Sequence, residues 1–220
     1  MSPSSRGLGH RVFISATGVR LPLGMHIKIT SSEIIILNNR SIKQKFCSLC
    51  SSPVTIKIPE DDNRDRAVCD KCGTIFYENP KVVAGCLLVW EEKILLCKRA
   101  TEPRSGYWTL PAGFMENYET VEEGALRETM EEAGAESDNI KLFMMCNLPH
   151  ISQVYMMYQG DLSNGNYKAG PESEEVKLFS KDEIPWNELA FTVIEKTIKA
   201  YYDDIEKGKI NIHFDTIIKK

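Results

Sequence analysis

Three glutamates at helical spacing are the residues of this sequence whose chemistry is easiest to infer. Glu128, Glu131 and Glu132 are related by i, i+3 and i+4, so on an α-helix their carboxylates share one face. We find no Lys or Arg at the neighbouring turns on that face, and three like charges so close repel one another. The spacing therefore predicts a site for Mg²⁺, or for Mn²⁺ with the same hard oxygen ligands. The alternative is an acidic helix face exposed to solvent.

The helix that carries these glutamates has recognisable ends in the sequence. Thr120 and Glu123 form a capping box, which predicts that the helix begins there. Gly134 predicts its end. The residues expected on the opposite face, anchoring the helix to the core, are Leu126, Met130 and Ala133.

Four of the seven cysteines form two C-x2-C pairs. Eighteen residues separate the pair Cys47 and Cys50 from the pair Cys69 and Cys72, a spacing typical of a four-thiolate zinc site. Such a site has no open position for water or substrate, so its role is structural. Two redox dithiols and unliganded cysteines are the weaker alternatives. The other cysteines, Cys86, Cys97 and Cys146, lie in or beside apolar runs and are expected to be small buried hydrophobes.

The charge of the chain is unevenly distributed. Residues 1–46 hold seven of the 27 basic residues and one of the 31 acidic ones, which leaves 20 basic and 30 acidic residues in 47–220. An acidic folded part argues against a general affinity for nucleic acid, and no apolar run is long enough to span a bilayer. The basic segment 1–44 is typical of an organelle transit peptide. An unstructured extension, or a start at Met25, is the alternative.

The remaining apolar periodicity predicts an α/β fold. Residues 82–90 and 93–99 form an expected hairpin around Glu91 and Glu92. A terminal helix shows apolar residues at helical spacing from Phe191 to Ile205 and a stop at Gly208. Strands, helix, strands and helix in this order favour a mixed sheet between helices. The other expected strands are 141–148, 153–162 and 176–180.

The segment Gly113–Ala135 resembles the Nudix box, Gly-x5-Glu-x7-Arg-Glu-U-x-Glu-Glu-x-Gly-U, where U is aliphatic. Two positions depart from the box: Thr129 and Ala135 occupy the U positions, and both are small enough to be buried. The matching residues are Gly113, Glu119, Arg127, Glu128, Glu131, Glu132 and Gly134.

The resemblance extends beyond the box. With the cysteine quartet, the run Asn79–Gly85, the run Trp108–Gly113 and the tail after Lys207, the chain is similar to the plant chloroplast FAD/ADP-ribose pyrophosphatases. It implies a Nudix α/β/α sandwich preceded by a small zinc ribbon. The expected organisation is an N-terminal extension 1–44, a zinc ribbon 45–78, a Nudix domain 79–207 and a C-terminal tail 208–220.

The resemblance also implies roles for individual residues. Glu128, Glu131 and Glu132 carry the metal, and Arg127 orients a glutamate, either Glu119 or one of the ligands. The general base is Glu132 or Glu175, with Glu172 and Glu174 close enough to confuse the assignment. Arg99 either meets the substrate phosphates or is an ordinary surface charge. The aromatic residues considered for stacking on a substrate ring, or for the core, are Tyr107, Trp108, Tyr155 and Tyr158.

The implied reaction is Mg²⁺-dependent hydrolysis of a nucleoside diphosphate derivative. FAD is the first choice of substrate and ADP-ribose the second. The Ser-Gln-Pro-Trp-Pro-Phe-Pro segment of NADH pyrophosphatases is absent, since residues 152–158 read Ser-Gln-Val-Tyr-Met-Met-Tyr. The alternatives are an NADH or coenzyme-capped RNA pyrophosphatase and a zinc-ribbon binding module on an inactive Nudix scaffold. The expected location is a plastid, or otherwise the cytoplasm. The expected assembly is a homodimer.

Overall fold

The computed structural model describes residues 44–218 of the chain. The expected transit peptide falls almost entirely outside this range. The chain divides into two compact units, Met1–Thr74 and Ile75–Lys220. None of the helices in the described range combines the length and the apolar composition that a bilayer crossing requires.

The smaller unit is built around two cysteine turns and a short antiparallel pair of strands. Strands β1 (Val54–Lys57) and β2 (Arg66–Cys69) pair with Val54 opposite Cys69. The side chains of β1 are mostly exposed, so this unit buries little apolar surface of its own. A unit of this size needs another source of stability, such as a bound metal.

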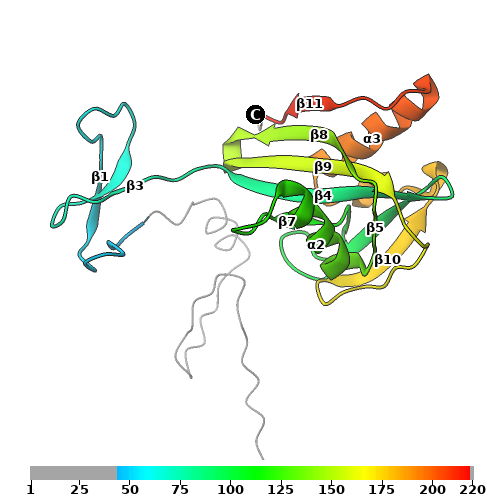
Figure 1. The fold of residues 1–220 in the computed structure, drawn as a ribbon, viewed down its shortest axis with the longest axis horizontal. Helices are drawn as coiled ribbons and strands as arrows, with labels where there is room; N and C mark the ends of the chain where they lie inside the picture. The colour runs from blue at the N-terminus through cyan, green and yellow to red at the C-terminus, as the bar shows by residue number, and fades with distance from the viewer. Residues whose placement is uncertain (1–43, 219–220) are drawn as a thin grey trace, which may run out of the picture. The chain divides into compact units, whose positions relative to one another are not determined.

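The larger unit is a mixed eight-stranded sheet whose main path runs β10-β5-β4-β9-β8-β11 (Figure 1). Strand β4 pairs antiparallel with β5 and parallel with β9, while β8 pairs antiparallel with β9. Two short strands join the sheet off this path, β6 beside β5 and β7 beside β4. The bounds of its strands are β4 Lys81–Trp90, β5 Lys93–Arg99, β6 Trp108–Thr109, β7 Ala112–Phe114, β8 Lys141–Leu148, β9 Gln153–Asp161, β10 Ser173–Phe179 and β11 His213–Thr216. Strand β3 (Ile75–Phe76) is not part of this sheet; it pairs with β2 in the three-stranded sheet β1-β2-β3.

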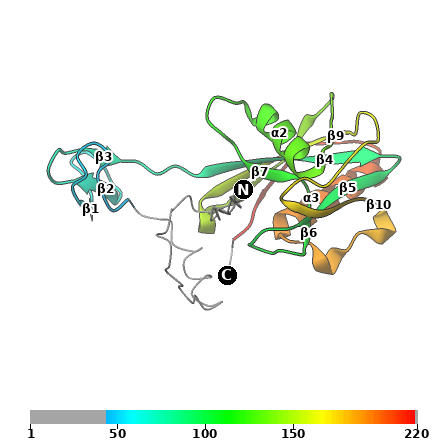
Figure 2. The same cartoon turned by 90° about the horizontal axis from the view of Figure 1, so that it is seen from below.

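Two helices cover opposite faces of this sheet (Figures 1 and 2). Helix α2 (Val121–Ala133) packs over Ala84, Cys86 and their neighbours, and helix α3 (Thr192–Lys207) packs over Leu87 and its neighbours. Adjacent strand residues point to opposite faces, so the apolar run of β4 supplies both cores. The short 3-10 helices are η1 Pro149–Ile151, η2 Lys181–Glu183 and η3 Trp186–Glu188. The expected mixed sheet between helices is confirmed.

Most of the expected elements are present. The 82–90 and 93–99 strands form the predicted hairpin, and Glu91 and Glu92 make its turn with positive φ angles of 47° and 65°. Cys86, Cys97 and Cys146 are buried, as expected. Strand β10 begins at Ser173, three residues before the predicted start, because its first part pairs with the end of β5 across a β-bulge.

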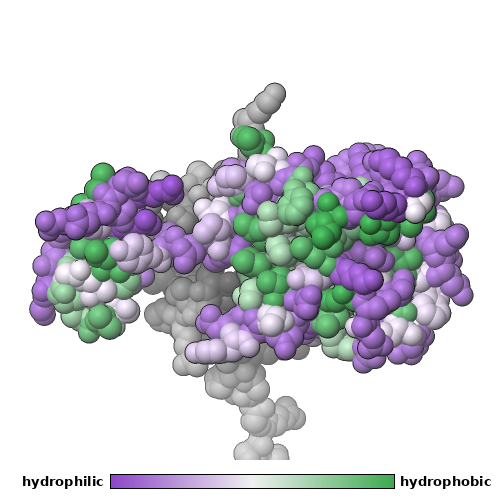
Figure 3. Space-filling view, turned by 45° about the horizontal axis from the view of Figure 1, so that its top comes forward, coloured by the Kyte–Doolittle hydropathy of each residue, from purple (hydrophilic) through white to green (hydrophobic). Residues whose placement is uncertain are grey.

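The C-terminal segment joins the sheet, which its sequence did not indicate. Strand β11 runs parallel to β8, with His213 beside Met144. The segment that leads into β11 is held in place by Asp204, which lies near the end of α3 and is 1% exposed. The Asp204 carboxylate accepts hydrogen bonds from the Asn211 backbone N–H (2.7 Å), the Asn211 side chain (3.2 Å) and His213 Nε2 (2.9 Å). Apolar side chains nevertheless remain at the surface of the larger unit (Figure 3). Near the C-terminus, the exposed apolar residues are Ile210, Ile212, Phe214 and Ile218.

We expect Asp204→Asn to lower the free energy of unfolding by about 1–3 kcal/mol, because an amide nitrogen then faces N–H donors. Burial opposes ionisation of Asp204, but the bonds from His213 and Asn211 outweigh it and hold its pKa below 3.8. The stabilisation is thus present above pH 3.8 and is lost as the pH falls through the lowered pKa. Urea unfolding at pH 7 measures the effect. The exposed neighbour supplies the control, Asp203→Asn, which should change stability by less than about 0.5 kcal/mol.

Candidate active site and zinc-binding cysteines

Helix α2 begins and ends where its sequence predicts. The Thr120 side chain accepts from the Glu123 N–H, and the Glu123 carboxylate accepts from the Thr120 N–H at 2.7 Å. Gly134 adopts a left-handed conformation and closes the helix by donating its N–H to the Met130 carbonyl. The glutamates thus lie in the last two turns of a helix with fixed ends.

The buried face of α2 differs from the expected one. Met130 is 43% exposed and Leu126 is only half-buried, so the prediction that they anchor the helix was wrong. Small side chains occupy the contact with the sheet instead, and the Cys86 thiol lies 3.6 Å from the Ala125 carbonyl. A helix that approaches a strand this closely has no room for Leu or Met. Its buried residues are Gly124, Ala125, Thr129, Glu132 and Ala133.

Arg127 is the centre of an ion-pair network at this site. Its guanidinium donates to both oxygens of Glu119 (2.9 and 2.8 Å), to Glu128 (2.8 Å), to Glu131 (3.0 Å) and to the Phe114 carbonyl (3.1 Å). These bonds raise the pKa of Arg127, and together with the Glu116 N–H they lower the pKa of Glu119 to about 2. The expectation that no cation lies on the carboxylate face was therefore wrong, because Arg127 precedes Glu131 by one helical turn (i, i+4) and so borders that face.

Glu132 is held differently, by the backbone and by burial. It is 7% exposed, and its carboxylate accepts from the Ala112 N–H at 3.0 Å. Burial, with a smaller contribution from the charge of Glu128, raises the pKa of Glu132 to about 7. Burial also raises the pKa of Glu128. The Glu128 carboxylate lies against Gly113, where an added Cβ would come within 2.3 Å of it.

Of the three glutamates at positions 172, 174 and 175, Glu172 is the one whose charge acts on the glutamates of the helix. Its charge raises the pKa of both Glu128 and Glu132. Glu174 pairs with Lys98 at 3.8 Å, and the exposed Glu175 lies opposite Lys98 in the β10–β5 ladder. Sequence spacing alone did not separate these residues, because the bulge between Ser173 and Glu175 shifts the alternation of side chains.

Arg99 lies near the carboxylates at the end of β5. Its positive charge lowers the pKa of Glu132 and of Tyr155, although burial raises both overall. The guanidinium also donates to the Pro103 carbonyl at 3.0 Å and lies 5.4 Å from the centre of the Phe191 ring. Arg99 thus acts on Glu132 through its charge and contacts the ring of Phe191.

Of the four aromatic residues considered for stacking, two belong to the core. Trp108 is 7% exposed and meets Phe179 edge to face, and Tyr158 is 5% exposed beneath α2. Tyr107 and Tyr155 are partly exposed. Only these two therefore offer part of a ring to a ligand.

The cysteine quartet has the geometry of a tetrahedral metal site. The sulfur atoms of Cys47, Cys50, Cys69 and Cys72 all lie within 4.8 Å of one another, and three of the separations are 3.5–3.6 Å. Zinc at about 2.3 Å from each sulfur requires separations of about 3.8 Å. Two matching turns present the pairs, with the Ser51 N–H bonded to the Cys47 carbonyl and the Gly73 N–H to the Cys69 carbonyl. The donor set fits a structural Zn²⁺.

The carboxylates of α2, with that of Glu119 just before the helix, also form a donor set that fits a divalent cation. Hard cations such as Mg²⁺ and Mn²⁺ take carboxylate oxygens, and Glu119, Glu128, Glu131 and Glu132 together outnumber the charge of Arg127. Within the described part of the chain, these oxygens are not drawn together as closely as the sulfurs are. Arg127 holds Glu128 and Glu131, while Ala112 holds Glu132.

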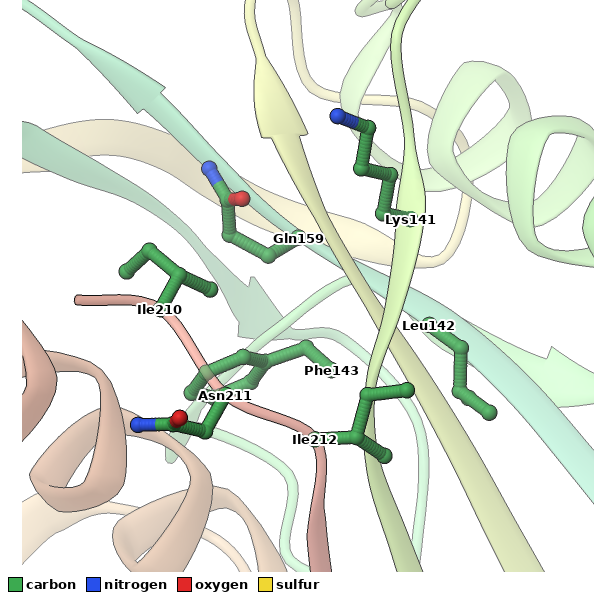
Figure 4. Close-up of a pocket in the computed structure, with 7 residues that line it drawn as sticks. All are labelled: Lys141, Leu142, Phe143, Gln159, Ile210, Asn211 and Ile212. Atoms are coloured by element: carbon green, nitrogen blue, oxygen red, sulfur yellow. The ribbon is translucent and has the colours of Figure 1, made fainter.

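A separate open pocket of about 360 Å³ lies away from these glutamates. It is formed by β8, β9 and the segment leading into β11 (Figure 4). It contains one cation, Lys141, and no carboxylate. None of the residues singled out in the sequence lines it; the lining residues are Lys141, Leu142, Phe143, Gln159, Ile210, Asn211 and Ile212.

The fold and the carboxylate helix define the class of this protein. Residues 79–201 match the NUDIX domain model, and residues 45–78 match the model described as Nudix N-terminal, a zinc ribbon. The chain therefore belongs to the Nudix family, in the group with an N-terminal zinc ribbon. The crystal structure of a NUDIX hydrolase from Nitrosomonas europaea is similar, with a TM-score of 0.77 and 50% identity over 80% of this chain and all of that one.

Curated relatives have more specific descriptions. An NAD-capped RNA hydrolase NudC from Vibrio atlanticus is 26% identical over 83% of this chain and 66% of its own length. One from Photobacterium profundum is 30% identical over 56% of this chain and 44% of its own. An ADP-ribose pyrophosphatase from Methanocaldococcus jannaschii is 45% identical over 26% of this chain and 34% of its own. The chain thus spans about half to two thirds of the NudC relatives.

We expect one zinc ion per chain, measured by elemental analysis of protein purified without added metal. Cys69→Ser should remove it, because the buried Cys69 sulfur is one of four ligands and an alcohol is a poor substitute for a thiolate. Cys97→Ala is the matched control, since this buried cysteine lies outside the quartet, and it should retain the zinc. A wild-type protein without zinc and with four freely reactive thiols would contradict the assignment.

Proposed function

We propose that this protein hydrolyses the diphosphate bond of a nucleoside diphosphate derivative in a reaction that depends on Mg²⁺ or Mn²⁺. The single observation that carries the proposal is the excess of carboxylates over cations at the end of α2. Glu128, Glu131 and Glu132 lie there on neighbouring turns, the charge of Glu172 acts on Glu128 and Glu132, and Arg127 is the one cation bonded to them among the described residues. Negative charge on the largely buried side chains of Glu128 and Glu132 is costly unless a cation offsets it, and a binding scaffold has no need for it.

Each residue has a place in this proposal. Glu128, Glu131 and Glu132 hold the cation, and Arg127 with Glu119 keeps the first two in position. A bound divalent cation would supply neutralisation of the diphosphate oxygens and activation of a water molecule. Glu132 and Glu175 are the two candidate general bases. The charge of Glu172 raises the pKa of Glu128 and Glu132. This favours Glu172 over Glu175 as an additional carboxylate of the site.

FAD and ADP-ribose are the substrates we propose first. ADP-ribose is supported by the Methanocaldococcus relative, whose 58-residue match is 45% identical. FAD depends on the resemblance of the sequence to plant chloroplast enzymes. Arg99 is the proposed phosphate contact, because its charge acts on Glu132 and Tyr155 at once. In this proposal, Tyr155 contacts a ring attached to the diphosphate.

Hydrolysis of NAD-capped RNA is the second candidate. Its support is the match to the Vibrio NudC over 83% of this chain. Against it stand the acidic composition of residues 47–220 and the sequence at 152–158, which lacks the NADH pyrophosphatase segment. The two candidates share the bond that is cleaved and differ in what lies beyond the diphosphate.

A comparison of kcat/KM for FAD, ADP-ribose, NADH and NAD-capped RNA in Mg²⁺ tests the proposal. We expect FAD or ADP-ribose to give the highest value and AMP to be a product of either. A preference for NAD-capped RNA by tenfold or more would establish the second candidate instead. If none of the four is hydrolysed, the proposed function is wrong and a binding role is favoured.

Glu131→Gln and Glu132→Gln should each lower kcat by at least about 100-fold, because each removes a charged metal ligand. The fold should survive, since the amide keeps the shape of the side chain. Turnover and circular dichroism measured together separate the two effects. The control is Glu122→Gln in the first turn of α2, which is exposed and should leave kcat unchanged. Normal turnover in both ligand variants would refute the assignment.

A further inference from the structure

The open pocket beside β8 and β9 combines apolar walls with one pair of polar side chains (Figure 4). Lys141 and Gln159 lie opposite each other across the two strands and both line it. Phe143, Ile210 and Ile212 supply apolar surface. A volume of about 360 Å³, an apolar lining and a few polar groups are typical of sites for small molecules.

The apolar base of the pocket is fixed by packing. Phe143 is the extra residue of a β-bulge between Leu142 and Met144, and it is 1% exposed. Its ring meets the rings of Tyr201 and His213 edge to face, at centroid distances of 6.4 and 5.0 Å. A ligand in the pocket would therefore meet a ring that is already held in place.

The wall opposite the strands is fixed by hydrogen bonds. The Asp204 carboxylate holds the backbone and the side chain of Asn211, and the Lys209 N–H bonds to the Asp204 carbonyl at 3.1 Å. Ile210 lies between these two anchored residues, and Ile212 follows them. Their side chains are nevertheless 44% and 54% exposed. The wall is thus formed before any ligand binds, and its apolar side chains remain open to one.

The polar pair has no partner among residues 44–218. No acidic side chain of this range pairs with the Lys141 ammonium, and no group in it bonds to the Gln159 amide. Asp161, two positions after Gln159 on β9, is bonded to Asn139 at 2.7 Å instead. No carboxylate lines the pocket, although residues 47–220 hold 30 acidic and 20 basic residues. The pocket therefore offers one positive charge in an otherwise acidic part of the chain.

We propose that this pocket is a binding site for a small organic acid in its ionised form. The apolar body of the ligand packs against Phe143, Ile210 and Ile212, and its carboxylate accepts hydrogen bonds from Lys141 Nζ and the Gln159 amide. The site is separate from the carboxylate helix, and the proposal does not rest on the proposed function.

The charge of the pocket selects this class of ligand. A single ammonium balances a single negative charge, whereas a phosphate monoester would bring a second charge into an acidic domain without a cation to offset it. A cationic ligand would find no carboxylate in the lining. A neutral apolar ligand would cover the Lys141 and Gln159 side chains without satisfying them, which costs free energy.

A pair of probes with the same shape, 1-naphthoate and the uncharged 1-naphthamide, tests the proposal on the full chain. NMR spectra of isoleucine methyl groups give both the location and the affinity of binding. The signals of Ile210 and Ile212 should move, and those of the exposed Ile58 and Ile151 should not. Naphthoate should bind about tenfold more tightly than naphthamide, because hydrogen bonds to a charged group are the stronger ones.

Two variants assign this preference to the polar pair. Lys141→Met keeps the apolar stem and removes the charge, so naphthoate should bind about tenfold more weakly while naphthamide binds as before. Gln159→Glu places a carboxylate opposite Lys141, where it can pair across the strands, and it should weaken naphthoate binding by at least as much. Retained naphthamide binding shows in both cases that the pocket is intact. Lys177→Met, at an exposed strand position on β10, is the matched control and should behave like the wild type.

Three results would overturn the proposal. The first is equal affinity of the wild type for the two probes. The second is a set of shifts at Ile58 and Ile151 as large as those at Ile210 and Ile212, which would show unspecific apolar binding. The third is a change of the Ile210 and Ile212 signals with protein concentration in the absence of a probe, which would show that a second copy of the chain covers the pocket.

Discussion

The hydrogen bonds of Arg127 are the interaction on which the site depends. One guanidinium joins the end of β7 through the Phe114 carbonyl, the loop before α2 through Glu119, and the helix through Glu128 and Glu131. Carboxylates at neighbouring helical positions repel each other, and a flexible cation such as Lys offers no planar fork to bind several of them at once. Arg127 therefore allows an acidic helix end to exist before any metal binds.

The second constraint is the distance between α2 and the sheet. Glu132 reaches the Ala112 N–H only because the helix lies close to β4 and β7, and that closeness depends on small residues on both sides. Gly113 leaves room for the Glu128 carboxylate, and Thr129 is fully buried with its hydroxyl bonded to the Ala125 carbonyl at 2.7 Å. The departures at Thr129 and Ala135 from the usual aliphatic residues are thus accommodated, since both are buried.

Local sequence signals predicted most elements and the helix that carries the site. The capping box at Thr120, the stop at Gly134 and the hairpin turn at Glu91 are each determined by a few adjacent residues. The errors concern contacts between distant parts of the chain. Met130 was assigned to the core by its apolarity, whereas the close helix contact selects small residues. Strand β11 pairs with β8 from 69 positions away, at His213 and Met144, and no local pattern encodes such a partner.

The same difference between local signals and long-range contacts explains why the sequence indicates the reaction better than the substrate. The carboxylates proposed to bind the metal lie within five positions of one helix, so their spacing is visible in the sequence. Arg99, Tyr155 and Glu172 come from the end of β5, from β9 and from the loop before β10. Only the folded sheet lets the charges of Arg99 and Glu172 act on Glu132 and the charge of Arg99 act on Tyr155. A Nudix chain can therefore keep its box and change these three surroundings independently. If the proposed function holds, these three residues are where selectivity for the group beyond the diphosphate would be determined.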